Sequence, residues 1–140
     1  MHDWGAFPVY FHKDVGHALR SRQVVESDIL PYLPLTADQK DILLETIELH
    51  DDRDMRPTKS NEALLLREAD MLEFLGMMGL AREISRGPKN VETCYKRILS
   101  RRDGIRDCFT LPRAQEIAKV RLERMEACLG WLIEESFGAM

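Results

Sequence analysis

Apolar residues recur at helical spacing in the first part of the chain and predict two helices. The first covers about residues 15–30 and ends where Pro31 follows, because proline has no amide hydrogen to continue the helical bonding. The second starts at a capping-box pattern, in which Gln39 follows Thr36 by three residues, and it extends to His50. A pair of helices with a proline-containing connection is therefore expected here.

A polar loop and a strongly apolar helix are predicted next. Residues 51–60 contain charged residues and proline but little apolar content, which is typical of an exposed loop. Ser60 or Asn61 can cap the following helix, whose apolar residues cover much of its circumference. Such a broad apolar surface predicts that this helix is central and buried.

The remaining sequence also predicts helices. A helical segment continues beyond Gly76 with a bend, a further helix covers about residues 91–102, and the longest helix runs from a cap at Thr110 to Gly138. No stretch alternates between apolar and polar residues for long enough to indicate a sheet. The predicted fold class is all-α, an irregular bundle of about five to six helices.

The composition suits one soluble domain. The chain has 140 residues, of which 44% are apolar, and domains of about 100–150 residues are the commonest. We therefore expect a single helical domain over residues 1–140. Its 20 basic and 24 acidic residues give a net charge of −4. The chain therefore lacks the overall positive electrostatic field that attracts the phosphates of nucleic acids.

The sequence carries no signal for a membrane or for an oxidising compartment. No apolar run approaches the roughly 18 residues of a membrane span, and the first residues lack a secretory signal pattern. Three widely spaced cysteines match neither a metal pair nor a disulfide framework, so reduced thiols are expected: Cys94, Cys108 and Cys128. These features predict a cytoplasmic protein with no nucleic-acid or membrane partner.

Candidate metal ligands occur at separate places along the chain. His2 is followed by Asp3, and adjacent nitrogen and oxygen ligands suit a divalent transition metal, although an isolated pair is also typical of a solvated terminus. Asp70 lies within an apolar helix, where a carboxylate is costly unless it is paired or holds a metal. His50 ends an apolar helix, where it either stabilises the helix dipole or serves as a ligand.

Taken together, these residues resemble the HD phosphohydrolase family of helical metal-dependent enzymes. In that family a His-Asp pair is followed in many members by two further histidines, and then by an Asp within a sequence similar to ADxLDxxGxxG. The residues that carry the resemblance stand in the same order here: His2-Asp3-Trp4-Gly5, His17, His50, and Ala69-Asp70-Met71-Leu72-Glu73 followed by Gly76 and Gly79. Glu73 replaces the second, more usual Asp.

The resemblance implies a site for a divalent ion, with manganese, iron, cobalt, nickel, zinc or magnesium as the candidates. Its primary ligands would be His2, Asp3 and Asp70, while His17 and His50 match positions that serve a second metal or the substrate phosphate in some members. The family's leading metal-binding histidine lies well before the His-Asp pair. We therefore expect that the chain begins inside this element and that one ligand is missing.

The implied chemistry is hydrolysis of a phosphate ester. A bound metal would polarise the phosphoryl oxygen and lower the pKa of bound water towards about 7. Asp3 would bridge metal and water, and His17 and His50 would assist. Basic residues near the histidines in the sequence are the expected contacts of the substrate phosphate: Lys13, Arg20, Arg22, Arg53, Arg56 and Lys59.

The predicted function is therefore an HD-type, metal-dependent phosphohydrolase acting on a small phosphorylated compound, for example a nucleotide. The alternative is a catalytically inactive or truncated domain of the same fold that acts through protein binding, which the missing histidine favours. A third interpretation is an interaction module whose surface consists of Met77, Met78 and Leu80. A homodimer is a further expectation, since a second copy could cover apolar surface left by an absent helix.

Overall fold

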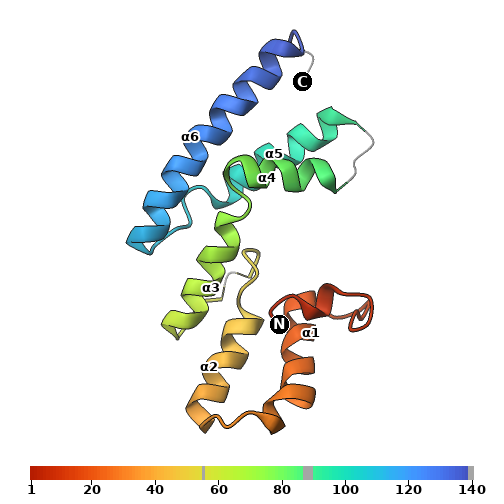
Figure 1. The fold of residues 1–140 in the computed structure, drawn as a ribbon, viewed down its shortest axis with the longest axis vertical. Helices are drawn as coiled ribbons and strands as arrows, with labels where there is room; N and C mark the ends of the chain where they lie inside the picture. Colours follow the sequence, from red (N-terminus) through yellow and green to blue (C-terminus); the bar gives the residue numbers. More distant parts are fainter. Residues whose placement is uncertain (55, 87–89, 139–140) are drawn as a thin grey trace. The chain divides into compact units, whose positions relative to one another are not determined.

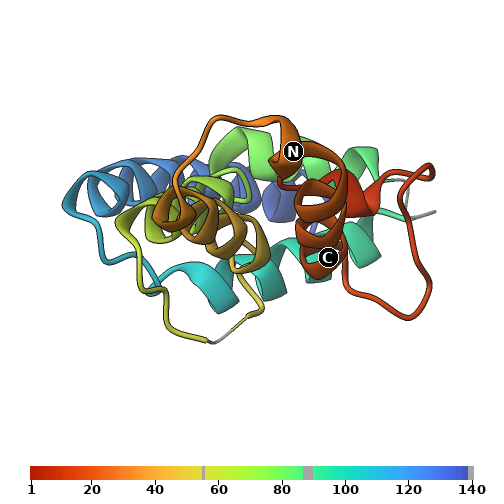
Figure 2. The ribbon, with the colours of Figure 1, turned by 90° about the horizontal axis from the view of Figure 1, so that it is seen from below.

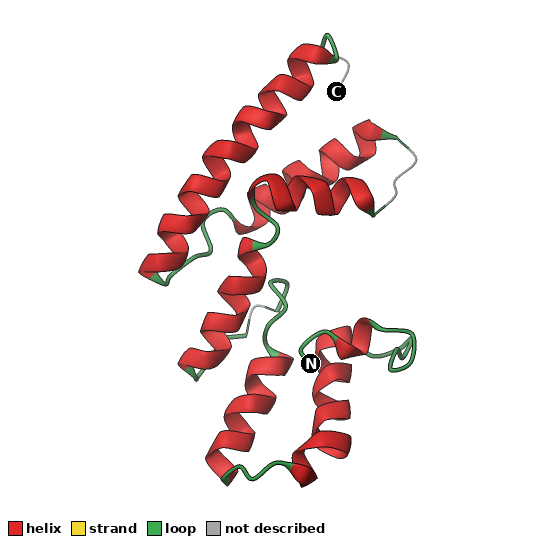
Figure 3. Cartoon of the chain, viewed as in Figure 1, coloured by secondary structure: helices red, strands yellow, loops and turns green. Residues whose placement is uncertain are grey.

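The structure, a computed structural model, describes residues 1–54, 56–86 and 90–138. Every regular element in these ranges is helical, and no strand occurs among them (Figure 3). The predicted all-α class is therefore confirmed, with six α-helices in the described part of the chain. The chain divides into two compact units, Met1–Asp70 and Met71–Met140. The prediction of a single HD-type domain stays a prediction.

The first unit contains a pair of antiparallel helices and several short helical turns. Helix α1 leads away from the N-terminal segment, and α2 returns beside it (Figure 1). Residues 7–16 loop out on the side of α1 away from α2 (Figure 2). In chain order the elements are η1 (Trp4–Ala6), α1 (His17–Val24), η2 (Val25–Ile29), η3 (Leu30–Tyr32), α2 (Ala37–Glu48) and the first part of α3 (Asn61–Leu72).

The first predicted helix is present but changes its winding. The α-helical part ends at Val24, and the chain continues as a π-helical turn and then as the 3₁₀ turn η3. Pro31 lies at the start of η3, where an amide hydrogen has no partner within the turn. The proline therefore tightens the end of the helix, and the chain can reverse into α2.

The predicted capping box at the start of α2 is confirmed. The Thr36 hydroxyl oxygen accepts from the Gln39 amide at 3.3 Å, and the Gln39 side chain accepts from the Thr36 amide at 2.9 Å. The apolar stripe of α2 then packs on the segment after α1 and forms the core of the first unit. Its buried members are Val25, Leu30, Leu44 and Ile47.

The second unit is built on α4 (Gly76–Ser85), which contacts both α5 (Val91–Ile105) and α6 (Pro112–Glu135). The predicted bend is a short turn that separates α3 from α4, and Gly76 at its end has a φ of +70°, a conformation that favours glycine. The predicted cap Thr110 lies one residue before the observed N-cap of α6, Leu111.

The apolar residues of the second unit form a larger core. Leu75 is fully buried in it, and Leu80 is also buried, whereas Met77 and Met78 are exposed. The predicted surface of Met77, Met78 and Leu80 is therefore wrong for Leu80. None of the helices in the described part of the chain combines the length and the apolar character that crossing a membrane requires.

Leu75→Ala tests this core. Removing a fully buried leucine side chain leaves a cavity, so we expect the free energy of unfolding to fall by about 3 kcal/mol. Met78→Ala is the matched control, because the Met78 side chain is 69% exposed and its removal leaves no cavity. Urea unfolding of both variants measures the difference, and equal effects would contradict the described core.

Candidate functional site

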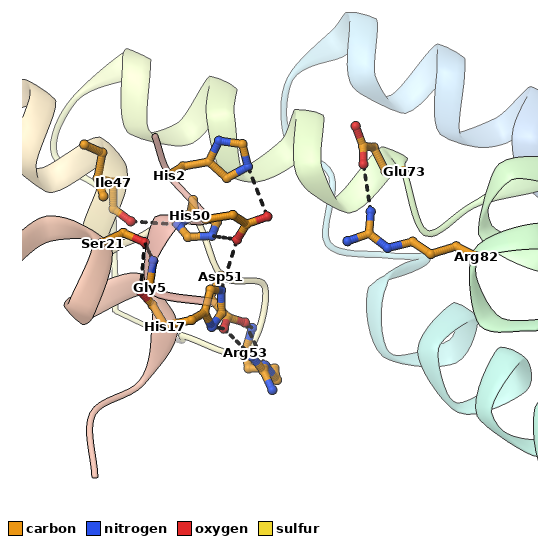
Figure 4. A network of polar contacts seen from close by, with 11 residues as sticks. His2, Gly5, His17, Ser21, Ile47, His50, Asp51, Arg53, Glu73 and Arg82 are labelled. Carbon is orange, nitrogen blue, oxygen red and sulfur yellow. Dashed lines mark hydrogen bonds and ion pairs between the residues drawn. The ribbon is translucent and has the colours of Figure 1, made fainter. Parts of the chain in front are cut away.

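The Asp3 carboxylate faces three imidazole rings. His50 Nε2 lies 3.3 Å from Asp3 Oδ1, and His17 Nε2 lies 3.5 Å from the same oxygen. On the other side, His2 Nε2 lies 3.5 Å from Asp3 Oδ2. Figure 4 shows the three histidines close together, with dashed lines for these contacts. Four of the candidate residues are thus brought together from three segments of the first unit.

The N-terminal segment reaches this position through a contact of its backbone with α1. The Gly5 amide donates to the Ser21 hydroxyl at 2.8 Å, and that hydroxyl donates to the His17 carbonyl oxygen at 2.9 Å. A Cβ atom at Gly5 would lie 2.1 Å from the same carbonyl oxygen. The close approach therefore requires glycine at position 5, and it holds the His2-Asp3 pair next to His17.

The third histidine is held at the end of α2 by the loop that follows. Arg67 donates from Nε to the Leu49 carbonyl oxygen at 2.7 Å, directly before His50. At the far end of the loop, the Glu45 carboxylate accepts from the backbone amides of Lys59 at 2.7 Å and Ser60 at 3.1 Å. The loop is thus anchored on both sides, and His50 has a fixed position.

A backbone hydrogen bond orients the His50 ring. Its Nδ1 lies 2.7 Å from the Ile47 carbonyl oxygen, so a proton on Nδ1 is donated to this acceptor. In the ring protonated on both nitrogens, Nε2 donates to Asp3 at 3.3 Å, and loss of the Nε2 proton leaves a lone pair there for a metal. A metal-binding histidine is commonly oriented in this way, with one nitrogen bonded to a carbonyl and the other free to coordinate.

The contacts within the cluster shift the pKa values of Asp3 and His50. The hydrogen bond from His50 lowers the pKa of Asp3; burial opposes this, and the nearby His2 and His17 add to it. Burial favours the neutral His50 ring, but the bonds to Asp3 and Ile47 outweigh it and raise the pKa of His50. Asp3 is thus an ionised carboxylate at neutral pH, as a metal ligand must be.

Three members of the cluster lie close enough together that they could hold one metal ion. The ligand atoms of His2, Asp3 and His50 all lie within 4.8 Å of one another. Two imidazole nitrogens and a carboxylate oxygen suit a transition metal such as zinc, manganese or iron. Among the described residues this group does not include His17 or Asp70, whose roles as ligands stay predictions. The negative charge of Asp70 contributes to the raised pKa of His50.

No protein-family model, curated protein or solved structure matches the chain.

Three of the residues predicted to bind the substrate phosphate make their contacts away from the histidine cluster. Lys13 lies in the exposed loop before α1. Arg20 donates from Nε to the Tyr10 carbonyl oxygen at 2.7 Å, and Arg22 pairs with Glu48 at 2.9 Å. None of these three cations lines the hollow beside His17, so their role in binding phosphate stays a prediction. Glu73, in the second unit, pairs with Arg82 at 2.8 Å (Figure 4).

Asp51 lies on the outer side of His17 and was not selected from the sequence, whereas its partner Arg53 was an expected phosphate contact. Asp51 Oδ2 is 3.6 Å from His17 Nδ1. Arg53 binds the Asp51 carboxylate through Nε at 2.8 Å and through its terminal nitrogen at 2.5 Å. Burial opposes ionisation of Asp51, but the bonds from Arg53 lower the pKa of Asp51 to about 2. The usable signal in the sequence was a second His-Asp pair, His50-Asp51.

A hollow of about 750 Å³ opens beside this group. Its wall combines the start of α1 with the loop after α2, and it contains both carboxylates and guanidinium groups. The lining residues are Gly16, His17, Ala18, Leu19, Glu48, Asp51, Arg53, Asp54 and Arg56. The histidine cluster therefore borders a space of the size that small ligands occupy, about 300–1,000 Å³.

Gly5→Ala tests how the cluster is assembled. The added methyl group collides with the backbone of α1, so we expect the free energy of unfolding to fall by about 2 kcal/mol or more. Gly130→Ala is the control, since nothing lies near a Cβ there and alanine favours the helix by about 0.5–1 kcal/mol. Thermal unfolding of both variants should show opposite shifts; a neutral Gly5→Ala would disprove the close approach.

Asp51→Asn tests the ion pair with Arg53. Folding lowers the pKa of Asp51 from 3.8 to about 2, so its stabilising effect is present above pH 3.8 and is lost as the pH falls towards 2. After allowing for solvent screening, the effect at pH 7 is about 1–2 kcal/mol. Urea unfolding at several pH values should show a weaker acid dependence for Asp51→Asn. An unchanged acid dependence would contradict the pair.

Proposed function

We propose that this chain is a metal-dependent phosphohydrolase that acts on a small phosphorylated compound. The observation that carries the proposal is the convergence of His2, Asp3 and His50, which offer one oxygen and two nitrogen ligands within 4.8 Å of one another. The order of the histidines and aspartates along the chain, which resembles that of the HD phosphohydrolases, supports the same conclusion.

The three residues differ in how they would hold an ion. His50 is 1% exposed and is oriented by the Ile47 carbonyl, so it presents Nε2 with little freedom. Asp3 and His2 lie on a segment that is fixed through Gly5. When bound, the metal would act as a Lewis acid and would supply hydroxide from water at neutral pH.

His17 has a different position in the proposed site. It lies beside Asp3, but its ring also borders the hollow where a substrate would enter. An imidazole can donate a proton to a leaving oxygen or accept one from water. We assign it this acid-base role, together with the contact to the substrate phosphate that the resemblance implies.

The hollow also offers guanidinium groups to an anionic substrate. The Arg53 and Arg56 side chains are 68% and 58% exposed, and both line its wall. Both are paired with carboxylates, so a phosphate would bind by sharing these cations. The predicted contacts Lys13, Arg20 and Arg22 remain part of the proposal as outer contributors of positive charge.

The metal content of the purified protein tests the proposal, together with hydrolysis of p-nitrophenyl phosphate and of nucleoside monophosphates in added Mn²⁺. The native chain should bind about one ion and hydrolyse at least one of these compounds. In Asp3→Asn the metal affinity should fall more than about tenfold, because even outer partners of metal ligands contribute about 10–100-fold. Asp14→Asn is the matched control, since Asp14 lies in the exposed loop before α1.

The outcomes separate the two candidate functions. Loss of metal and of turnover in Asp3→Asn, with Asp14→Asn unchanged, supports the phosphohydrolase. Metal binding by the native chain without turnover would favour the inactive domain that acts through protein binding. A native chain that neither binds metal nor hydrolyses any compound would overturn the proposal.

A further inference from the structure

We infer that a hollow in the second unit binds a small acid that carries a carboxylate on an apolar body. The hollow has a volume of about 610 Å³ and is formed by α4, the turn before it and one residue of α6. Its lining residues are Glu73, Met78, Ala81, Arg82, Ser85 and Arg121. None of these belongs to the histidine cluster or to the hollow beside His17, so the inference does not rest on the proposed function.

Arg121 is held at this hollow by two contacts with the turn that separates α3 from α4. One terminal nitrogen of its guanidinium group donates to the Leu72 carbonyl oxygen. The first carbons of its side chain pack at the other end of the turn, where a Cβ atom at Gly76 would lie 3.3 Å from them. Among the described residues no carboxylate pairs with Arg121, so its positive charge is available to a ligand.

Arg82 brings a second guanidinium group to the hollow, from α4. One of its terminal nitrogens lies 2.8 Å from Glu73 Oε2 (Figure 4), and its guanidinium carbon lies 4.7 Å from the centre of the Phe74 ring. The ion pair and the aromatic ring together fix the position of this group. The Arg82 side chain is still 35% exposed, so a ligand can reach it.

The charges of the lining favour an anion with one negative charge. Arg82 and Arg121 are positive and Glu73 is negative, which leaves the hollow with a net charge of +1. An ionised carboxylate carries one negative charge, and its two oxygens match the planar donors of a guanidinium group. A phosphate dianion would exceed the positive charge of the hollow. We therefore assign a carboxylate as the charged group of the ligand.

The wall along α4 adds an apolar surface beside the two cations. Met78, Ala81, Arg82 and Ser85 follow one another at helical spacing and form one stripe of α4. Met78 is 69% exposed, and a methionine side chain adapts its shape to varied apolar groups. Small-ligand sites of about 300–1,000 Å³ typically combine an apolar wall with a few charged groups that fix the orientation. The hollow has both parts.

Titration calorimetry with octanoate tests the inference, because octanoate combines a carboxylate with an apolar chain. For a ligand of about ten non-hydrogen atoms, the native chain should bind one equivalent with a Kd of about 1 mM or lower. Octanol has the same chain without the charge and should bind at least about tenfold more weakly, since its hydroxyl forms no ion pair. Inorganic phosphate, which has no chain, should also bind more weakly than octanoate.

Met78→Glu and Met77→Glu form a matched pair of variants. Each replaces an exposed side chain by a carboxylate in the first turn of α4, where the helix dipole favours a negative charge. Of the two, Met78 lines the hollow. Met78→Glu should therefore weaken octanoate binding at least about tenfold by repulsion. Met77→Glu should change it less than about threefold at about 0.15 M salt, because salt screens the more distant charge.

Arg121→Gln removes the cation that has no carboxylate partner and should weaken octanoate binding at least about tenfold. Arg124→Gln is its control, because Arg124 is exposed on α6 and does not line the hollow. The Met78→Glu result keeps the test decisive if Arg121→Gln does not fold.

Three results would each overturn the inference. The first is a native chain that shows no saturable binding of octanoate. The second is an affinity for octanol or for inorganic phosphate that equals the affinity for octanoate. The third is an equal effect of Met77→Glu and Met78→Glu on octanoate binding.

Discussion

The first unit depends on how a partly buried carboxylate is compensated. Asp3 loses hydration where the N-terminal segment meets α1, and an ionised carboxylate tolerates this only when positive or polarisable groups replace the water. Three imidazoles provide that replacement, each from a different part of the unit. The arrangement that stabilises the Asp3 charge also brings nitrogen and oxygen atoms close together. The contacts that stabilise the fold are therefore the same ones that could bind a metal ion.

Much of the fold could be predicted because its signals are local. The capping box of Thr36 and Gln39 marks the start of α2 within the sequence that forms it, and the apolar stripe after it indicates the buried face. The change of winding before Pro31 was not predictable, because it depends on the packing of the core around Val25 and Leu30. At Leu80, helical spacing alone did not show which side of α4 faces the core.

The candidate site, like the fold, could be predicted only in part. His2, Asp3, His17 and His50 were selected because histidines and acidic residues are recognisable by type, and the resemblance supplied their order. Their meeting at one carboxylate depends on contacts across as many as 47 residues, which no local pattern specifies. Asp51 was missed because its contact with His17 joins the loop after α2 to the start of α1, two segments that are distant in sequence. The phosphate contacts were chosen by proximity in sequence, and of these Arg53 and Arg56 line the hollow whereas Lys13, Arg20 and Arg22 do not.

The contact between Gly5 and Ser21 also bears on how the sequence can vary. Neither residue offers a metal ligand or a proton donor to a substrate, yet one must lack a side chain and the other must carry a small hydroxyl group. Ala6, the next residue along, is exposed and is free of this restriction. Across variants of this chain, the least replaceable positions near the site would therefore include two without any chemistry of their own. A search guided only by reactive side chains would overlook them.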